Sequence, residues 1–175
     1  ENKNLILSIC IPTYNGMSDI LKSLKYIEKA FSPYNDHIEV CISDNGSNDD
    51  TFKNINKFVK VSSLKIKLHH FVQNQGFDRN ILKVLEMSKA KYAWLFGDDE
   101  FLVKKEAIKV FKFLSEKQSN NNVLLYQVGV ISYTKDKKFR KKIVSKKENE
   151  ISKSEAIFQT PAFISTIIFN KIYID

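Results

Sequence analysis

The stretch Lys91-Tyr-Ala-Trp-Leu-Phe-Gly-Asp-Asp-Glu100 joins a buried-type apolar segment to three consecutive acids. The aromatic and aliphatic residues predict a core strand, so Asp98, Asp99 and Glu100 come at its carboxyl end, where open α/β sheets bind ligands. Three adjacent like charges are tolerable when they are exposed or neutralised, and hard cations such as Mg²⁺ or Mn²⁺ prefer carboxylate oxygens. The alternative is that these acids only cap a helix beginning near Lys104.

Working outward, three more apolar runs predict strands at residues 5–11, 38–43 and 64–72. Apolar residues recur at helical spacing between them, and again after the acids over residues 104–118. Strand and helix therefore alternate four times. This order predicts a doubly wound α/β fold, in which a mostly parallel sheet carries helices on both faces.

Two turns carry the signals that end or begin these elements. Pro12 and the residues after it are expected to stop the first strand. Ser47 and Asn48 are N-cap candidates for the second helix, with Asp49 and Asp50 as acids in its first turn.

The C-terminal part has a different pattern. A strand is predicted over residues 123–133, and a densely basic segment over 135–147 predicts a solvated hairpin or a mobile loop. A short helical stretch at 154–158 and a strand at 163–169 follow. This part does not continue the alternation.

Composition limits the class of protein. With 175 residues and 43% hydrophobic content, the chain can bury a core and is expected to form one domain over 1–175. The net charge of +8 suits anionic partners such as nucleotides, nucleic acid or an anionic membrane. Cys10 and Cys41 fall in apolar runs and are expected to be reduced core residues of a cytosolic protein, although a pairing stays open. No apolar run reaches the roughly 20 residues that span a bilayer, and no signal peptide is recognised.

Polar residues follow each of the first four predicted strands, and in a parallel sheet they converge on one crevice. Tyr14 offers a ring on which a base can stack, and Asp44 and Asn45 can bond a base edge or a ribose. Gly76 permits close approach of the backbone to a ligand. The full set is Thr13, Tyr14 and Asn15 after the first strand, Asp44 and Asn45 after the second, Gly76 and Asn80 after the third, and Asp98, Asp99 and Glu100 after the fourth.

Four segments together resemble the ordered motifs of family-two glycosyltransferases. They are Ser8-Ile-Cys-Ile-Pro-Thr-Tyr-Asn15, Ser43-Asp-Asn-Gly-Ser-Asn-Asp-Asp-Thr51, Asn74-Gln-Gly-Phe-Asp-Arg-Asn80 and Trp94-Leu-Phe-Gly-Asp-Asp-Glu100. The resemblance implies the GT-A fold and an inverting transfer of a sugar from a nucleotide diphosphate, with UDP favoured, to a glycan or lipid-linked acceptor. It further implies Mg²⁺ or Mn²⁺ as cofactor and a bacterial enzyme of surface-polysaccharide synthesis. The nucleotide-sugar part would cover about residues 5–102 and a partial acceptor side about 120–175.

By that resemblance, each motif residue takes an expected role. Asp98 faces the ribose, Asp99 binds the metal and Glu100 stands behind it, although a register with Asp98 and Glu100 as the pair stays open. The family has a second acid where this chain has Asn45, so the nucleobase also stays open. The residues expected to hold the nucleotide are Pro12, Thr13, Tyr14, Asn15, Asp44, Asn45, Gly76, Asn80 and Asp98.

The resemblance does not identify a catalytic base, because no acidic pair follows the basic segment, and the chain looks truncated before it. Two other functions stay open: a non-catalytic module that binds nucleotides or sugars, and a basic domain that binds nucleic acid, although no recognition motif favours the latter. A cytoplasmic location is expected, with peripheral contact of the basic segment to an anionic membrane as an alternative to a solvated face. The histidines, His37, His69 and His70, are expected to be structural.

Overall fold

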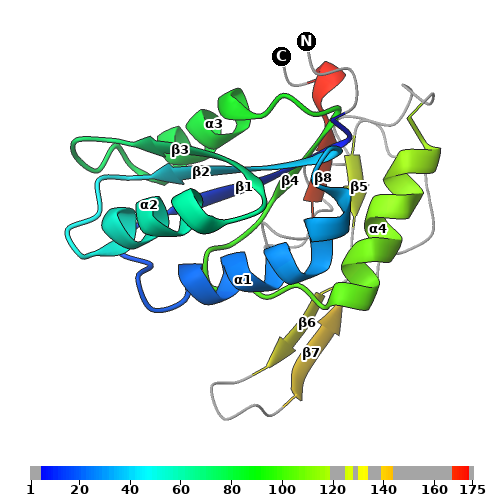
Figure 1. The fold of residues 1–175 in the computed structure, drawn as a ribbon, viewed down its shortest axis with the longest axis horizontal. Coiled ribbons are helices and arrows are strands. Elements are labelled where there is room, and N and C mark those ends of the chain that lie inside the picture. The colour runs from blue at the N-terminus through cyan, green and yellow to red at the C-terminus, as the bar shows by residue number, and fades with distance from the viewer. Residues whose placement is uncertain (1–4, 119–124, 128–129, 134–138, 144–166, 174–175) are drawn as a thin grey trace.

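The computed structural model describes residues 5–118, 125–127, 130–133, 139–143 and 167–173. Strands and helices alternate through the first four strands, as the sequence predicts (Figure 1). The strands are β1 (Leu7–Thr13), β2 (Ile38–Asp44), β3 (Lys65–His70), β4 (Tyr92–Leu95), β5 (Leu125–Gln127), β6 (Val130–Tyr133), β7 (Phe139–Ile143) and β8 (Ile167–Asn170). The α-helices are α1 (Ile20–Phe31), α2 (Thr51–Val61), α3 (Phe77–Met87) and α4 (Lys104–Glu116), and short 3-10 helices cover Ser32–Tyr34 and Lys171–Tyr173.

The main sheet has the strand order β3-β2-β1-β4-β8-β5. The first four of these strands are parallel, whereas β8 runs antiparallel to both β4 and β5. The order reverses direction at β1, which pairs with β2 on one side and with β4 on the other. The carboxyl ends of β1, β2, β3 and β4 therefore lie along one edge, and the switch point sits at β1.

Helices cover both faces of the sheet, which explains why β1, β2 and β4 are buried at nearly every position. On one face Leu7, Ile9 and Ile11 pack in the larger core cluster, together with buried residues of α1, α2 and α4. On the other face Cys10 and Cys41 pack against α3. Alternating side chains point to opposite faces of a strand, so both covered faces need apolar residues.

The two cysteines stand opposite each other in the β1–β2 register and are buried and unpaired, as expected for reduced core residues. A hydrogen bond with Cys41, together with burial, raises the pKa of the Cys10 thiol well above its usual value. Thiols of this kind behave as small apolar groups rather than as nucleophiles.

β1 extends through Pro12 to Thr13, so the expectation that Pro12 stops it is wrong. Cys10 and Pro12 direct their backbone groups toward the same neighbour, β4, because backbone direction alternates along a strand. Pairing of β1 with β4 ends at Cys10 and Leu95. The missing N–H of Pro12 therefore faces a position where no ladder bond is required.

The single strand predicted over 123–133 is two strands in different sheets. β5 pairs with β8 in the main sheet, whereas β6 pairs with β7 in a separate two-stranded sheet. An apolar run does not specify its partners, so its division depends on tertiary pairing. The β6–β7 pair confirms a hairpin for the described part of the basic segment, while the helical stretch at 154–158 and residues 163–166 lie outside the described residues. Within the described residues no helix has the length and apolarity needed to cross a membrane.

The amino ends of the strands are closed by a buried polar network. Glu39, only 2% exposed, accepts hydrogen bonds from the Ser8 hydroxyl at 2.7 Å and the Lys89 backbone N–H at 2.5 Å. Its other carboxylate oxygen lies 2.7 Å from the ammonium of Lys67. Burial opposes ionisation, but these donors outweigh it and lower the pKa of Glu39.

Candidate functional site

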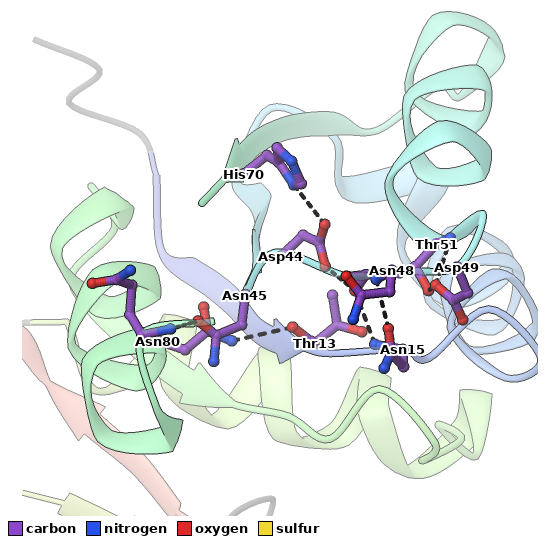
Figure 2. Close-up of polar contacts among 11 residues, drawn as sticks. Thr13, Asn15, Asp44, Asn45, Asn48, Asp49, Thr51, His70 and Asn80 are labelled. Carbon is purple, nitrogen blue, oxygen red and sulfur yellow. Dashed lines mark hydrogen bonds and ion pairs between the residues drawn. The ribbon is translucent and has the colours of Figure 1, made fainter. Parts of the chain in front are cut away.

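The turns that follow β1, β2 and β3 meet at the carboxyl edge of the sheet (Figure 2), and the turn after β4 joins them through the contact of Asp98 with Thr13. Thr13 and Asp44 are register partners, and the Asn45 backbone N–H donates to the Thr13 carbonyl at 2.9 Å. The Asn80 side-chain amide donates to the same carbonyl at 3.3 Å. The structure thus brings residues of the first three predicted motifs together around Thr13.

The turn after β1 is tied to the turn after β2. Asn15 adopts the left-handed conformation with φ of 52°, which asparagine tolerates better than most residues. Its backbone N–H donates to the Ser47 hydroxyl at 2.8 Å, and its side-chain oxygen accepts from the Asn48 backbone N–H at 2.9 Å. These two bonds flank Tyr14, a residue that is 42% exposed.

The prediction that Ser47 and Asn48 cap the second helix is wrong. Helix α2 begins at Thr51 with Asp50 as its N-cap, so Asp49 and Asp50 also lie before its first turn. Ser47 instead donates to Asp44, the last residue of β2 three positions before it, and Asn48 donates its backbone N–H to Asn15 in the turn after β1. The contact with Asn15 spans 33 positions, so a cap signal read locally cannot see it.

Asp44 ends β2 and is completely buried. One carboxylate oxygen accepts a hydrogen bond from the Ser47 hydroxyl, and the other lies 2.7 Å from Nδ1 of His70 (Figure 2). His70 is the last residue of β3 and stands opposite Asp44 in the β2–β3 register. Sequence reasoning assigned His70 only a structural role, although its place at a strand end beside the second motif was a usable signal.

Asn45 holds the turn after β3 in place. Its side-chain amide donates to the Asn74 side chain at 3.0 Å and to the Gly76 carbonyl at 3.1 Å, and its oxygen accepts from the Gln75 backbone N–H at 2.9 Å. Gly46, with φ of 71°, lies so close to this turn that a Cβ would come within 2.7 Å of the Gln73 backbone. Only glycine fits both that conformation and that approach.

Gly76 and Asn80 form the start of α3. A Cβ on Gly76 would meet no atom within 4 Å, so the space beside this glycine is open to a ligand. Asn80 is 3% exposed, and its side-chain oxygen has no hydrogen-bond partner among the described residues. A buried polar oxygen without a partner marks a position where a ligand or water completes the bonding.

The acidic turn contacts the turn after β1. The Thr13 hydroxyl donates to Oδ2 of Asp98 at 2.5 Å, and a Cβ on Gly16 would lie only 2.4 Å from that same oxygen. Gly16 therefore leaves the room that the Asp98 carboxylate occupies, a role that the sequence did not indicate. Burial raises the pKa of Asp98, and the charge of the neighbouring Asp99 adds to this, against the Thr13 hydrogen bond.

The three acids differ in their surroundings. Asp98 and Glu100 are partly buried, and Glu100 accepts from the Gly97 backbone N–H at 3.2 Å within its own turn. Asp99 is exposed. None of the three caps α4, whose N-cap residue is Val103.

The described residues contain no group of three or more His, Cys, Asp or Glu side chains that would hold a metal by itself. Mg²⁺ and Mn²⁺ sites often use only one or two carboxylates and complete their shell with substrate phosphates and water. The exposed carboxylate of Asp99, with the charge of Asp98 beside it, fits that kind of donor set.

A groove of about 430 Å³ lies beside β3 and α3 and is lined by His69, Phe71, Arg79, Leu82, Lys83 and Glu86. It contains none of the predicted site residues.

Comparison with known proteins agrees with this geometry. The chain matches the family "Glycosyl transferase family 2" over residues 8–171. It is 36% identical over 103 residues to Abequosyltransferase RfbV of Salmonella typhimurium strain LT2, an alignment that covers 57% of this chain and 30% of that protein. The chain thus spans less than a third of the length of this curated relative.

Solved structures show the same fold. TarS 1-349 of S. aureus in complex with UDP superposes with a TM-score of 0.71 at 19% identity, covering 95% of this chain and 47% of that chain. The mannosyltransferase PcManGT from Pyrobaculum calidifontis, in complex with GDP-Man and Mn²⁺, gives a TM-score of 0.63 at 18% identity over 75% of this chain and 37% of that chain. The expected GT-A architecture is confirmed, and the chain belongs to glycosyl transferase family 2.

Proposed function

We propose that this chain carries the donor-binding part of an inverting glycosyltransferase that moves a sugar from a nucleotide diphosphate, most simply UDP, to a glycan or lipid-linked acceptor. The observation that carries the proposal is the meeting of four turns at the carboxyl edge of the sheet in a chain of this family. UDP is the nucleotide in the TarS complex, and GDP-Man is the ligand of PcManGT, so the donor class has support from two neighbours.

Each turn supplies a different part of the nucleotide site. The exposed ring of Tyr14, after Pro12 and Thr13, offers a stacking surface for the base, and Asn15 holds that turn against Asn48. Asp44 is the acceptor for an N–H of the base edge. These roles use aromatic stacking and charge-assisted hydrogen bonding, both of which strengthen in a partly dry crevice.

The turn after β3 shapes the pocket. Asn45 positions Gly76 through its side-chain bonds, and Gly76 lets a ligand approach its backbone closely. From the first turn of α3, Asn80 offers a side-chain oxygen that no residue in the described part of the chain bonds. The start of that helix favours negative charge, which suits a diphosphate.

Asp99 is the residue we assign to a divalent Mg²⁺ or Mn²⁺ ion, with Asp98 turned to the ribose side. Glu100 is bonded within its own turn, which favours this register over one with Asp98 and Glu100 as the pair. When bound, the metal would neutralise negative charge on the departing diphosphate. Asp98 is held by Thr13 in the space that Gly16 leaves, so this carboxylate is oriented before a donor arrives.

Inversion further requires a general base that deprotonates the acceptor hydroxyl on the opposite side of the sugar. We assign no residue of this chain to that step. The residues named above bind and orient the donor, and transfer itself is proposed for the whole protein.

We also propose a cytoplasmic location with peripheral contact to an anionic membrane. Exposed lysines on α1 flank Tyr26, whose ring contacts Phe101 with centroids 5.4 Å apart. Tyr26 and Phe101 are each 49% exposed, and Phe101 lies shortly before Lys104 and Lys105, which begin α4. Aromatic rings among lysines suit the headgroup region of a bilayer.

The nucleotide proposal is tested by calorimetry with UDP and with GDP, in the presence of Mn²⁺ and in the presence of EDTA. We expect UDP to bind and the metal to strengthen binding at least tenfold, because Asp99 would hold the ion and the ion would neutralise charge on the diphosphate. Absence of UDP and GDP binding under both conditions would refute the proposed site. DNA binding that weakens steeply with salt would instead favour the nucleic-acid alternative.

Metal-strengthened UDP binding alone does not separate an enzyme from a binding module. Sugar transfer by a longer form of the protein that includes this chain makes that distinction. Co-sedimentation with vesicles of neutral or mixed neutral and anionic lipids tests the membrane contact, which we expect only with the anionic mixture and only at low salt.

A further inference from the structure

A histidine outside the family motifs holds the proposed base acceptor. His70 ends β3, and its Nδ1 lies 2.7 Å from Oδ2 of Asp44 (Figure 2). A carboxylate oxygen accepts hydrogen bonds, so Nδ1 is the nitrogen that carries the proton in this contact. The contact with Asp44 therefore defines the tautomer of His70, in which Nδ1 carries the proton and donates it.

The imidazole is itself held in place from two sides. Its ring stacks on Phe52 of α2 with centroids 4.3 Å apart and an interplanar angle of 27°. The backbone N–H of Phe71, the next residue, donates to the Asp44 carbonyl at 2.9 Å. Side chain and backbone at the end of β3 thus bond to the same residue of β2, which leaves the ring little freedom to turn away.

The Asp44 carboxylate can accept more hydrogen bonds than the described residues donate to it. Asp44 is completely buried, with Ser47 on one oxygen and His70 on the other. A carboxylate has about four acceptor sites, so two remain, and the directions of these two follow from where the partners stand. Rotation of the carboxylate would break the bond to His70.

We propose that His70 is a positioning residue that fixes the Asp44 carboxylate and thereby makes the site select a base with a ring N–H, as in uracil, over cytosine. Uracil carries a hydrogen on N3 that a carboxylate accepts, whereas N3 of cytosine is itself an acceptor and meets the carboxylate with like partial charge. The inference rests on the proposed function, because it requires that Asp44 faces the base.

Three substitutions separate the hydrogen bond from the ring. His70→Asn places an amide N–H close to the position of Nδ1, His70→Gln places one close to Nε2, and His70→Phe keeps the ring on Phe52 without a donor. His69→Asn is the matched control, since His69 precedes it on the opposite face of β3 and lines the groove beside β3 and α3.

The readouts are the Kd values for UDP and CDP measured by calorimetry with Mn²⁺, and the melting temperature without nucleotide. We expect His70→Asn to stay within about threefold of wild type for UDP, and His70→Gln and His70→Phe to lose about tenfold, as for one charge-assisted hydrogen bond. The preference for UDP over CDP should fall in the same two variants and remain in the control.

A role in packing alone would rank the variants by shape, so UDP binding by His70→Phe equal to or better than that by His70→Asn would overturn the proposal. Equal UDP-to-CDP ratios in wild type and all variants would also overturn it while leaving nucleotide binding intact. If His70→Phe fails to fold, the contrast between His70→Asn and His70→Gln decides. Wild-type protein that binds no nucleotide would refute the proposed function itself.

Discussion

Strand β2 carries a buried acid near each end, and the two acids differ in how many hydrogen-bond partners they have. Glu39, at the amino end, has three partners, Ser8, Lys67 and the Lys89 backbone, and its pKa is lowered. Asp44, at the carboxyl end, has one partner on each oxygen and acceptor sites left over. The same strand thus ends in a closed polar network on one side and in an incomplete one on the other.

The contrast extends across both edges of the sheet. At the carboxyl edge Asn15 is left-handed, the Asn80 side-chain oxygen has no partner among the described residues, and the pKa of Asp98 is raised. Left-handed backbone, unpaired polar groups and raised pKa values cost stability. They concentrate at binding and catalytic sites, because the rest of the fold supplies the stability that they cost. We therefore expect the amino edge to stabilise the fold and the carboxyl edge to bind a ligand. The following predictions test that division.

The largest effect is expected from Asp99→Asn, which removes the exposed carboxylate assigned to the metal. UDP affinity in Mn²⁺ should fall about 100-fold, to roughly the level in EDTA, because the bridging charge is lost. The melting temperature should stay within about 1 °C, since an exposed side chain contributes little to folding. Calorimetry and thermal unfolding provide the two readouts.

Asp50→Asn is the matched control for Asp99→Asn, because Asp50 is exposed and is paired only with Lys53 among the described residues. It should change neither quantity. If both variants weakened UDP equally, the effect would be one of net charge, and the metal assignment would fail.

Glu39→Gln should produce the reverse pattern. The substitution removes a buried carboxylate that accepts hydrogen bonds from Ser8 and Lys89 and pairs with the 43% exposed Lys67, so we expect a loss of about 2–3 kcal/mol in the free energy of unfolding. UDP affinity should be unchanged, because Glu39 lies at the other edge. Urea unfolding measures the first quantity, and Glu86→Gln, which opens an exposed pair with Lys83, should cost less than about 0.5 kcal/mol.

Gly46→Ala should lower the stability of the protein and also weaken UDP binding at the carboxyl edge. The φ of 71° and the approach of the Gln73 backbone to 2.7 Å predict a loss of about 2 kcal/mol and a weaker affinity for UDP. Gly76 also has a positive φ, 87°, but a Cβ there would meet no atom within 4 Å, so Gly76→Ala should lower the free energy of unfolding by less. Equal unfolding free energies for the two variants would mean that the close packing of the two turns is unimportant.

Asp98→Asn should stabilise the protein slightly while weakening donor binding. Burial and the charge of Asp99 raise the pKa of Asp98, which means that its ionised form is disfavoured in the fold at neutral pH. We expect the melting temperature at pH 7 to rise by about 2 °C. A clear fall would indicate that the Thr13 hydrogen bond outweighs the burial of the charge.

The smallest and most gradual effect is the dependence of the unfolding free energy on pH. The pKa of Glu39 is lowered from about 4.5, so its contribution to stability is complete above that pH and is lost as the pH falls through the folded-state value. The difference in unfolding free energy between wild type and Glu39→Gln should therefore shrink below about pH 4.5. A difference that stays constant down to pH 3 would show that the lowered pKa of Glu39 is not what stabilises this edge.

Much of the fold and part of the site could be predicted from the sequence. The helix bounds Ile20–Phe31 follow directly from the spacing of buried residues such as Leu24 and Ile27, because amphipathic periodicity is a local property. The run from 123 to 133 was misassigned as one strand, since its division depends on which strands pair with it. The caps of α2 are also mispredicted, because Asn48 bonds to Asn15 of another turn and Ser47 bonds back to Asp44 rather than to its own helix.

The sequence by itself determined the order of strands and helices, the edge where the motifs meet and the family, because these follow from local periodicity and from residues in a fixed order. Only the tertiary structure decided which polar groups bond to one another. Thr13 meets Asp98 across 85 positions, and His70 meets Asp44 across 26. Hydrogen bonds act over about 3 Å in space, and no spacing along a chain reports that distance.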